Sequence, residues 1–387
     1  MTTPSQSGAR RYTAIVETSI EDLDDPRVEG RTTHSLLNII VISLLAVMCG
    51  AKDWEDIEIY AQTCAKWLGE FLDLPAKRKI PGHDTFRRVL SALNPKAFSA
   101  ALFKLTQGLH EAVRGEVIAI DGKTLRGTCE RDGHGGLHLV TAWATETSLT
   151  LGMVPCDEKS NEIAAIPELL ALLDLKGATV TIDAMGCQVA IAQQIRDQKA
   201  HYVLGLKGNQ SGLLEEMESL LRDAQKNDFA NFEHQYHGEN SSDHGRVVER
   251  VCTALEIPAD HPQRERWPGL RTLFVIDSIR VESGAPKKRA TRLYISSLPP
   301  KADHLAMVVR SHWTTENRQH WSLDVSFGED AKRARDKNAL ANFAALTRLT
   351  LSLLRQETTR KTSIARKRFL CGLDTSYLLK VLKAAEF

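Results

Sequence analysis

The sequence predicts a mixed α/β protein with a helical N-terminal region, a five-stranded mixed sheet flanked by helices, and a β-rich insertion before the last helices. Three observations lead to this prediction. Apolar residues recur at helical spacing up to residue 113, short apolar runs replace them from residue 116, and residues 230–300 alternate between strand-like segments and turns rich in Gly, Pro, Asn and Ser. With 387 residues the chain has room for roughly two or three domains.

The N-terminal part contains several short segments with helical periodicity. Leu36–Ala51 is the most apolar window, but its 16 residues fall short of the roughly 20 that cross a bilayer, so we expect a buried core helix. Trp54–Leu72 and residues 83–94 predict further helices. These helices are compatible with a helix-turn-helix that presents Arg87 and Arg88 to DNA, and equally with an ordinary bundle whose arginines are solvated.

The central part predicts strands joined by helices in the order βββαβαβα. The expected strands are 117–120, 137–144, 148–154, 179–182 and 202–206, and the expected helices are 161–173, 187–198 and 213–224. A three-strand meander followed by parallel strands with crossover helices gives a mixed sheet covered on both faces. We expect the first and fourth strands to be parallel neighbours.

The last part combines a β-rich insertion with C-terminal helices. Strands are expected at 233–236, 246–255, 271–282 and 292–297, with GENSSDHG as one of the turns, and helices are expected from Ala302 onward and over Asn342–Arg355. The chain then divides into a helical region at 1–113, the first part of a sheet-forming core at 114–228, the insertion at 229–300, and the second part of the core with C-terminal helices at 301–387.

The overall composition argues against several classes of protein. The net charge is +1, so an anionic partner has to be bound by local clusters rather than by a general positive field. The seven cysteines form no CxxC pair and show no metal-ligand spacing, which argues against a disulfide framework or a zinc site and favours a reducing cytoplasm. The N-terminus lacks the apolar stretch of a signal peptide, and we expect no membrane partner.

Two of the predicted strands lead into an aspartate. Val-Ile-Ala-Ile precedes Asp121, and Val-Thr-Ile precedes Asp183. Because the carboxyl ends of adjacent parallel strands lie together, the two carboxylates are expected to be neighbours and to repel each other unless a cation lies between them. A hard divalent cation such as Mg²⁺ takes oxygen ligands of this kind. Taken singly, each Asp is more typical of a residue that caps the following turn.

A third acid lies in the segment RSHWTTENRQHW. His312, Glu316 and His320 are spaced at i, i+4 and i+8, which places them on one polar stripe of a helix. A carboxylate flanked by imidazoles indicates a functional site, although a solvent-facing stripe explains the same spacing. Trp313 and Trp321 are more often core residues than platforms for bases, although one of them could hold a flipped base. The HExxH motif is absent, so the sequence does not support a zinc protease.

Four basic residues are further candidates for contacts with nucleic acid. Lys123 and Lys207 lie just beyond strand ends on the same rim as the aspartates, where they suit backbone phosphates. Arg246 and Arg250 alternate on a strand of the insertion and are placed to follow DNA. A solvated surface position explains each of these residues equally well.

Several motifs carry a resemblance to a known family. They are DPRVEGR, HDTFRRVL, AIDGKTLRG, KSNEI, TIDAMGCQ, YVLGLKGNQ, HGRVVER and RSHWTTENRQHWSLDVSFGEDAKRAR. Together with the strand order and the three acids, they resemble the RNase H-like DDE transposases and integrases, and most closely the H-repeat-associated branch of bacterial insertion-sequence transposases. The motifs span about residues 25–355. The resemblance implies that Asp121, Asp183 and Glu316 form the DDE triad.

The resemblance also implies an activity and its partners. The expected reaction is hydrolysis of a DNA phosphodiester followed by strand transfer, with two Mg²⁺ or Mn²⁺ ions that Asp121 bridges while Asp183 and Glu316 hold one each. Residues 230–300 correspond to the β-strand insertion that such transposases carry between the second Asp and the Glu. The helical region before residue 113 corresponds to the segment held to bind transposon ends. We expect a homo-oligomer in the active complex with DNA.

The chain departs from one signature of the wider insertion-sequence group, Tyr-x2-Arg-x3-Glu-x6-Lys. Val309, His312 and Leu323 occupy the Tyr, Arg and Lys places. Arg310, His312 and His320 are then the candidates for binding phosphate, and a hairpin pathway is not implied.

Two other functions remain open from the sequence. One is a metal-dependent nuclease on the same fold that cuts without joining, and the other is a domesticated, non-catalytic DNA-binding protein. The presence of all three acids weighs against the second.

Overall fold

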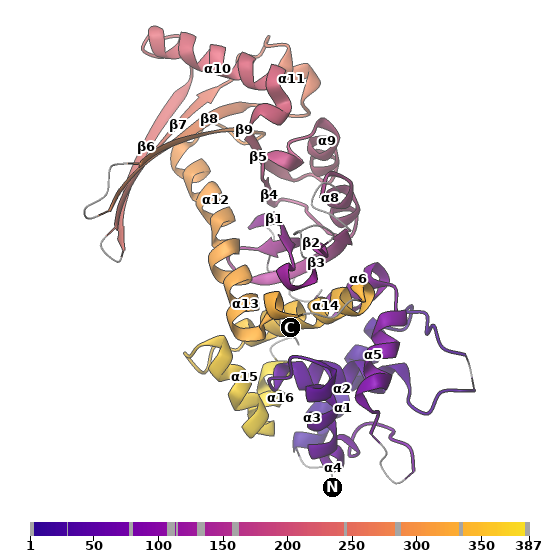
Figure 1. Cartoon of the computed structure of the whole chain (residues 1–387). Coiled ribbons are helices and arrows are strands. Elements are labelled where there is room, and N and C mark those ends of the chain that lie inside the picture. Colours follow the sequence, from indigo (N-terminus) through magenta and orange to yellow (C-terminus); the bar gives the residue numbers. More distant parts are fainter. Residues whose placement is uncertain are drawn as a thin grey trace.

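One mixed sheet joins the central part of the chain to the insertion. The structure is a computed structural model that describes residues 4–28, 30–76, 80–106, 113, 115–129, 136–156, 162–243, 246–282, 288–332 and 336–383. Its nine strands lie in the order β3-β2-β1-β4-β5-β9-β8-β7-β6 (Figure 1). The chain is therefore a mixed α/β protein, as the sequence predicts.

The five central strands follow the predicted order. They are β1 (Val117–Thr124), β2 (His138–Ala144), β3 (Leu149–Cys156), β4 (Thr179–Ile182) and β5 (His201–Leu206), and the helices after β3, β4 and β5 are α8 (Glu162–Ala171), α9 (Val189–Asp197) and α10 (Ser211–Lys226). Strands β1, β2 and β3 form an antiparallel meander, and β4 lies parallel between β1 and β5. The prediction that the first and fourth strands are parallel neighbours is confirmed.

One boundary differs in a way that affects the site. The first strand was expected to end at Ile120, but β1 continues to Thr124. Its parallel pairing with β4 does stop at Ile120, whereas its antiparallel pairing with β2 continues from Asp121 opposite Thr141 to Thr124 opposite His138. Asp121 is thus held in a hydrogen-bonded ladder on one side and faces the open end of β4 on the other.

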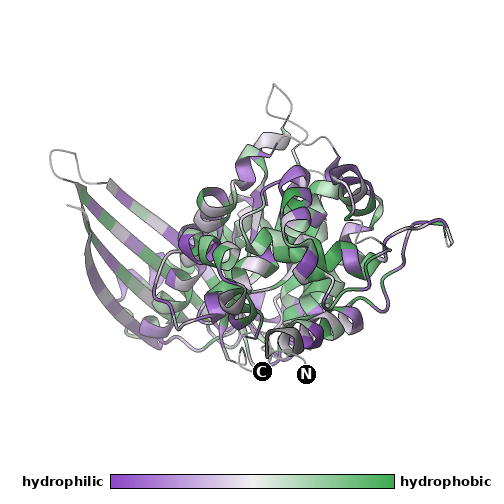
Figure 2. Cartoon of the chain, turned by 90° about the horizontal axis from the view of Figure 1, so that it is seen from below, coloured by the Kyte–Doolittle hydropathy of each residue, from purple (hydrophilic) through white to green (hydrophobic). Residues whose placement is uncertain are grey.

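The insertion extends the central sheet instead of forming a sheet of its own. Its strands are β6 (His234–Asp243), β7 (Arg246–Glu256), β8 (Thr272–Glu282) and β9 (Lys288–Ser296), and a short helix α11 (Gln263–Arg266) precedes β8. Strand β9 pairs antiparallel with β5, so the expected five-stranded sheet becomes a nine-stranded one. The expected turn GENSSDHG is also wrong, because β6 continues to Asp243. Figure 2 shows alternating hydrophilic and hydrophobic bands along these strands.

The two faces of the central sheet have different cores. Ile118 and Ile120 of β1 pack in the cluster that includes residues of α8 and α9. Val117 packs on the opposite face, in a cluster with Leu305 and Val308 of α12 (Ala302–Thr314). Because side chains alternate along a strand, the odd-numbered positions of β1, including 121 and 123, face α12.

The N-terminal and C-terminal helices share a third core. They are α1 (Pro4–Ser19), α2 (Leu36–Met48), α3 (Trp54–Thr63), α4 (Ala65–Leu68), α5 (His83–Ala92), α6 (Pro95–Lys104), α13 (Trp321–Phe327), α14 (Lys337–Gln356), α15 (Ile364–Leu373) and α16 (Thr375–Lys383). Residues 339–354 of α14 are all buried, since α14 packs on α2, α5, α6 and the edge strand β3. The prediction of a buried core helix over Leu36–Ala51 is confirmed by α2. Among the described helices, none has the length and apolarity to cross a membrane.

Candidate active site

Asp121 and Asp183 lie at matching positions on neighbouring parallel strands. The register pairs Ile120 with Ile182, so each aspartate follows the last paired residue at the same edge of the sheet. The Oδ1 atom of Asp121 accepts the backbone N–H of the next residue at 2.9 Å, and that of Asp183 accepts the backbone N–H two residues later, also at 2.9 Å. These bonds orient both carboxylates at the ends of rigid strands.

Glu316 is carried by a π-helical segment, Thr315–His320, that continues α12 into α13. The helix that the sequence predicts here is present, but the part that carries Glu316 is π-helical and not α-helical. A π-helical turn is wider than an α-helical one, and such turns are frequent at functional sites. Within the segment Thr315 and Gln319 are buried while Glu316 is exposed. In this wider turn, Thr315 and Gln319 point into the protein, and the carboxylate of Glu316 is left in solvent.

Two histidines bring this helix to the two aspartates. His312 Nδ1 lies 2.9 Å from Thr181 Oγ1, two residues before Asp183 on β4. His320 Nδ1 lies 4.0 Å from Asp121 Oδ2. Burial lowers the pKa of His312 to about 4 and that of His320 to about 3. Both imidazoles are neutral at pH 7, so they offer phosphate a hydrogen bond and no positive charge.

The carboxylates influence one another electrostatically. The pKa of Asp121 is raised to about 7, mainly by burial; the hydrogen bond from the Gly122 N–H lowers it, and the charges of Asp183, Glu162 and Glu316 add to the increase. Asp121 therefore holds its proton to a much higher pH than an ordinary aspartate. A buried carboxyl group that resists ionisation beside other acids is typical of a site that binds a cation or transfers a proton.

The chemistry of these donors fits a hard divalent ion. Asp121, Asp183 and Glu316 offer carboxylate oxygens, the ligands that Mg²⁺ takes, and a bound dication would relieve the repulsion that raises the pKa of Asp121. Within the described part of the chain, no three His, Cys, Asp or Glu side chains are grouped closely enough to hold a metal ion. The three carboxylates therefore have to approach one another to bind one.

Lys123 does not lie on an open rim, and that part of its prediction is wrong. Its side chain is 9% exposed, and Nζ lies 2.8 Å from Asp324 Oδ1 and 3.1 Å from Asp330 Oδ1. Both partners belong to the segment that follows Glu316 along the chain. Lys123 thus ties β1 to that segment, on the same face as Asp121. The sequence signal was present in the motif WSLDVSFGED, whose two Asp residues had no assigned partner.

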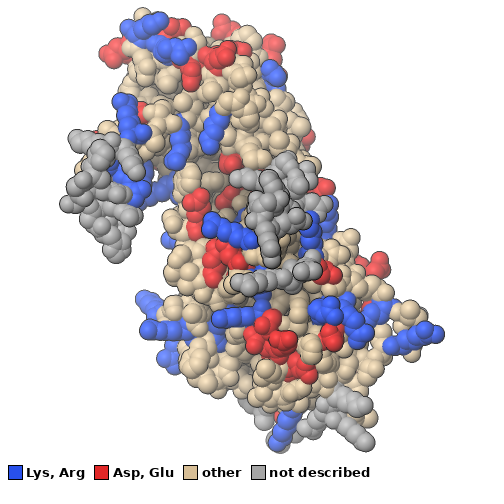
Figure 3. Space-filling view, in the orientation of Figure 1, with Lys and Arg blue, Asp and Glu red and all other residues tan. Residues whose placement is uncertain are grey.

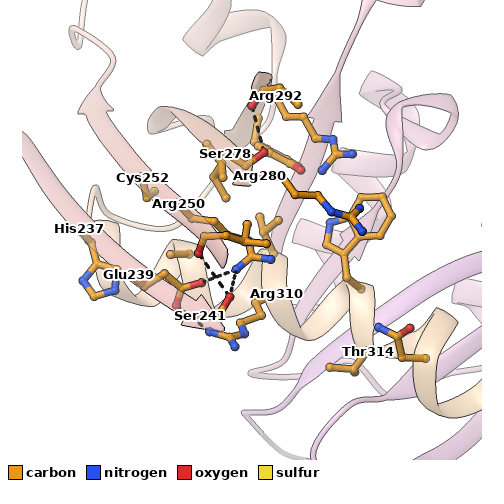
Figure 4. Close-up of a pocket in the computed structure, with 18 residues that line it drawn as sticks. His237, Glu239, Ser241, Arg250, Cys252, Ser278, Arg280, Arg292, Arg310 and Thr314 are labelled. Carbon is orange, nitrogen blue, oxygen red and sulfur yellow. Dashed lines mark hydrogen bonds and ion pairs between the residues drawn. The ribbon is translucent and has the colours of Figure 1, made fainter. Parts of the chain in front are cut away.

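The other predicted basic residues lie on two surfaces. Lys207 is exposed at the carboxyl end of β5, the strand next to β4. In Figure 3, Lys and Arg side chains gather where the insertion overhangs α12, and Asp and Glu side chains gather below them. Arg250 and Arg310 lie in a groove of about 850 Å³ at that place, and both contact Glu239, at 3.5 Å and 2.8 Å (Figure 4). The side chain of Arg246 lies outside the described residues.

The two tryptophans of the Glu316 segment are not core residues, contrary to expectation. Trp313 is 38% exposed and Trp321 is 59% exposed. The guanidinium of Arg292 lies 4.7 Å from the centre of the Trp313 ring, a cation–π contact between β9 and α12. Trp321 is presented to solvent on α13, past the π-helical segment.

Sequence reasoning missed a buried acid behind the site. Glu162 lies in the motif KSNEI, where it served only as the start of a helix. Its Oε1 lies 2.6 Å from His138 Nε2, and both side chains are almost completely buried. The pair touches Gly122 on the side of the sheet opposite Asp121, since a Cβ at Gly122 would lie 2.3 Å from each of these two atoms.

Gly122→Ala is expected to lower the free energy of unfolding by about 1–3 kcal/mol, because the added methyl group would overpack a buried pair that has no room to move. Urea unfolding followed by circular dichroism measures the change. Gly212→Ala is the control: it lies in α10 with open space around it, so it should be neutral or slightly stabilising. Equal stability of Gly122→Ala and the wild type would contradict the tight packing.

Comparisons with known proteins bear on the family to which the chain belongs. Residues 114–353 match the family model described as "Transposase DDE domain", and residues 18–106 match a model described as DDE_Tnp_1-associated. A relative from Escherichia coli O157:H7 described as a transposase, YncI, is 38% identical over 371 residues, 95% of this chain and 94% of its own length. YhhI of Escherichia coli K12, described as an H repeat-associated transposase, is 35% identical over 368 residues, 94% of this chain and 96% of its own length.

One solved structure is a more distant match. It is a cryo-EM structure of the piggyBac transposase synaptic complex with hairpin DNA, with 11% identity, 98% of this chain and 79% of that chain covered, and a TM-score of 0.38. A TM-score this low does not establish a common fold. The family models and the two bacterial relatives do establish the family: this chain belongs to the DDE transposases, in their H-repeat-associated branch.

Proposed function

We propose that this chain is a DNA transposase that hydrolyses a phosphodiester and then joins the freed 3′-hydroxyl to target DNA, using Mg²⁺ or Mn²⁺ held by Asp121, Asp183 and Glu316. One observation carries the proposal. The carboxyl ends of two adjacent parallel strands and one turn of a helix bring three acids near one another, although 195 positions separate the first from the last (316 − 121). The strand order β3-β2-β1-β4-β5 supports an RNase H-like core.

The reaction needs in-line displacement at phosphorus, with negative charge growing on the attacking and leaving oxygens. Two divalent ions, when bound, stabilise that charge on both sides. The chain would supply the ligands from three elements: Asp121 within the β1–β2 ladder, Asp183 with its bond to the Met185 N–H, and Glu316 on the helix, which has to move toward the two aspartates. The neutral His312 next to β4 keeps this helix in place without competing for the carboxylates as a cation.

DNA is the proposed partner of two further regions. Helices α1–α6, within the region 1–113, are proposed to hold the transposon ends, and the active complex is proposed to contain more than one copy of the chain. Lys207 is suited to a backbone phosphate, because it is exposed at the sheet edge that carries Asp183. Phosphate contacts of this kind give affinity that falls with salt and does not depend on sequence.

The proposal is tested with the purified full chain and a labelled duplex that ends in the terminal repeat of its element. We expect cleavage with Mg²⁺ or Mn²⁺, none with EDTA, and joining of the 3′-OH end to a target plasmid. Cleavage without joining would mean that the protein is a nuclease and not a transposase. If neither ion supports cleavage, the whole proposal is contradicted.

Glu316→Gln is expected to reduce the cleavage rate about 100-fold or more, since it removes the charge of one ligand to one ion. The rate is measured in single turnover at saturating DNA. Glu218→Gln makes the same chemical change at an exposed position on α10 and should cleave at the wild-type rate. Equal rates for Glu316→Gln and Glu218→Gln would remove Glu316 from the site.

A further inference from the structure

We propose that the groove between α12 and strands β6–β9 holds an unpaired DNA strand that leads to the acidic site. We call it the arginine groove and define it by Arg250, Arg280, Arg292, Arg310 and Trp313. The inference rests on the proposed function, since it names the path by which the DNA substrate of that site is held.

Charge is the first argument. The groove is lined by four arginines, and Glu239 is the one acid among its described lining residues. Because the whole chain has a net charge of only +1, this excess of positive charge is local. Glu239 contacts Arg250 and Arg310, so the arrangement leaves a net positive surface for a polyanion.

The spacing of the arginines is the second argument. The register aligns Arg250, Ser278 and Ala290 in one row across β7, β8 and β9. Arg280 lies two residues from this row toward the tips of the strands, and Arg292 lies two residues from it in the opposite direction. At about 3.4 Å per residue, the three guanidinium groups start from levels about 7 Å apart on one face of the sheet. Such a ladder suits successive phosphates of a strand better than one small anion.

An aromatic side chain is the third argument. Trp313 of α12 lies against the sheet, with the guanidinium of Arg292 on β9 4.7 Å from the centre of its ring. Grooves that bind single-stranded nucleic acid combine cations for the backbone with aromatic rings for the bases. Duplex DNA is instead read by protein elements that enter its grooves. Here the protein provides a cleft of about 850 Å³, which suits the narrower strand.

The groove reaches the helical segment that carries Glu316. Thr314 and Asn317 are among its lining residues, and Asn317 follows Glu316 directly in the π-helical segment. Figure 4 shows the arginines of the sheet and of α12 directed into the same space, with Thr314 at the lower edge. A strand lying along the arginine groove is therefore delivered to the helix turn that carries Glu316.

The test measures binding in EDTA, apart from any cleavage. A labelled oligonucleotide, single-stranded or as a duplex of the same sequence, is titrated with the full chain by fluorescence anisotropy at several salt concentrations. We expect tighter binding of the single strand. The double variant Arg280→Ala/Arg292→Ala should make the slope of log K against log salt shallower by about 1.4, because each lost phosphate contact contributes about 0.7. Trp313→Ala should bind the single strand about 5- to 150-fold more weakly.

Arg222→Ala is the matched control, since it removes an exposed arginine of α10 outside the groove and should leave affinity and slope unchanged. The inference is overturned if the duplex binds as tightly as the single strand, if the double variant keeps the wild-type slope, or if Arg222→Ala changes the slope as much. Arg280 and Arg292 are exposed, so the double variant should fold and tests the groove even if Trp313→Ala fails to fold.

Two outcomes separate this inference from the proposed function. If the double variant binds DNA like the wild type while Glu316→Gln loses cleavage, the groove is rejected and the catalytic proposal stands. If the double variant binds more weakly while Glu316→Gln cleaves at the wild-type rate, the catalytic triad is rejected and the groove stands.

Discussion

Asp121→Asn is expected to slow metal-dependent cleavage about 10³-fold or more while making the metal-free protein more stable. The loss of rate follows from the proposed role of Asp121 as a metal ligand, because removing its charge would cost several kcal/mol of transition-state stabilisation. The gain in stability follows from its environment, because burial and three neighbouring acids oppose ionisation of this carboxyl group.

The sign of the stability change depends on pH. The pKa of Asp121 is about 7 in the folded protein and about 3.8 as its ordinary value. Below pH 4, Asp121 is protonated in both the folded and the unfolded protein, so it does not lower the stability of the wild type. Between pH 4 and pH 7, Asp121 ionises in the unfolded protein but not yet in the folded one, which lowers the free energy of unfolding of the wild type. Above pH 7 this loss reaches its limit of about 4 kcal/mol. Since the side chain is 23% exposed, solvent screening reduces this limit, and we expect about 1–3 kcal/mol.

The measurement is urea unfolding in EDTA at pH 4 and pH 8. Asp121→Asn should match the wild type at pH 4 and exceed it at pH 8. Added Mg²⁺ should stabilise the wild type more than the variant at pH 8, because only the wild type has the full set of carboxylates. If Asp121→Asn is less stable than the wild type at pH 8, burial and the neighbouring acids do not oppose the ionisation of Asp121.

Arg348→Leu is expected to lower the free energy of unfolding by about 3–5 kcal/mol. Arg348 on α14 and Glu329 have no exposed side-chain surface, and their two-point contact joins Nη1 to Oε1 at 2.5 Å and Nη2 to Oε2 at 3.3 Å. Removing the arginine leaves a buried carboxylate without its partner, which is far more costly than removing both. Urea or thermal unfolding gives the change.

The double variant Arg348→Leu/Glu329→Leu separates the pair from the packing. It should recover most of the lost stability, because two apolar groups replace two buried charges. Arg222→Leu, at an exposed position, should change stability by no more than about 0.5 kcal/mol. If the double variant is as unstable as Arg348→Leu, the loss comes from the shape of the side chain and not from the unpaired charge.

The positions of Asp121 and Asp183 could be predicted because they depend on local patterns. Short apolar runs fix the strands, and crossover helices fix their parallel order, so the two strand ends had to meet. The environment of Lys123 could not be predicted in this way. Its alternation with Asp121 shows that they share a face, but its partners Asp324 and Asp330 lie about 200 positions later and reach it only through the packing of the helices.

Two features of the fold have no distinct sequence signal. The alternating strands of the insertion look the same whether they form a separate sheet or add to an existing one, and only the long-range pairing of β9 with β5 distinguishes the two. The π-helical segment is similar, because periodicity over six residues does not reveal a wider turn. Trp313 and Trp321 were assigned to the core by their residue type, whereas their exposure depends on how α12 and α13 face the insertion.

The pairing of β5 with both β4 and β9 has a mechanical consequence. The insertion joins the central sheet through the pairing of β9 with β5, which runs from Val203 opposite Ser296 to Leu206 opposite Leu293. The rest of its long strands project beyond this pairing. Sliding at that root would break the backbone hydrogen bonds of this register. Pulling on the projecting strands would load β5 and, through it, the strand that ends at Asp183.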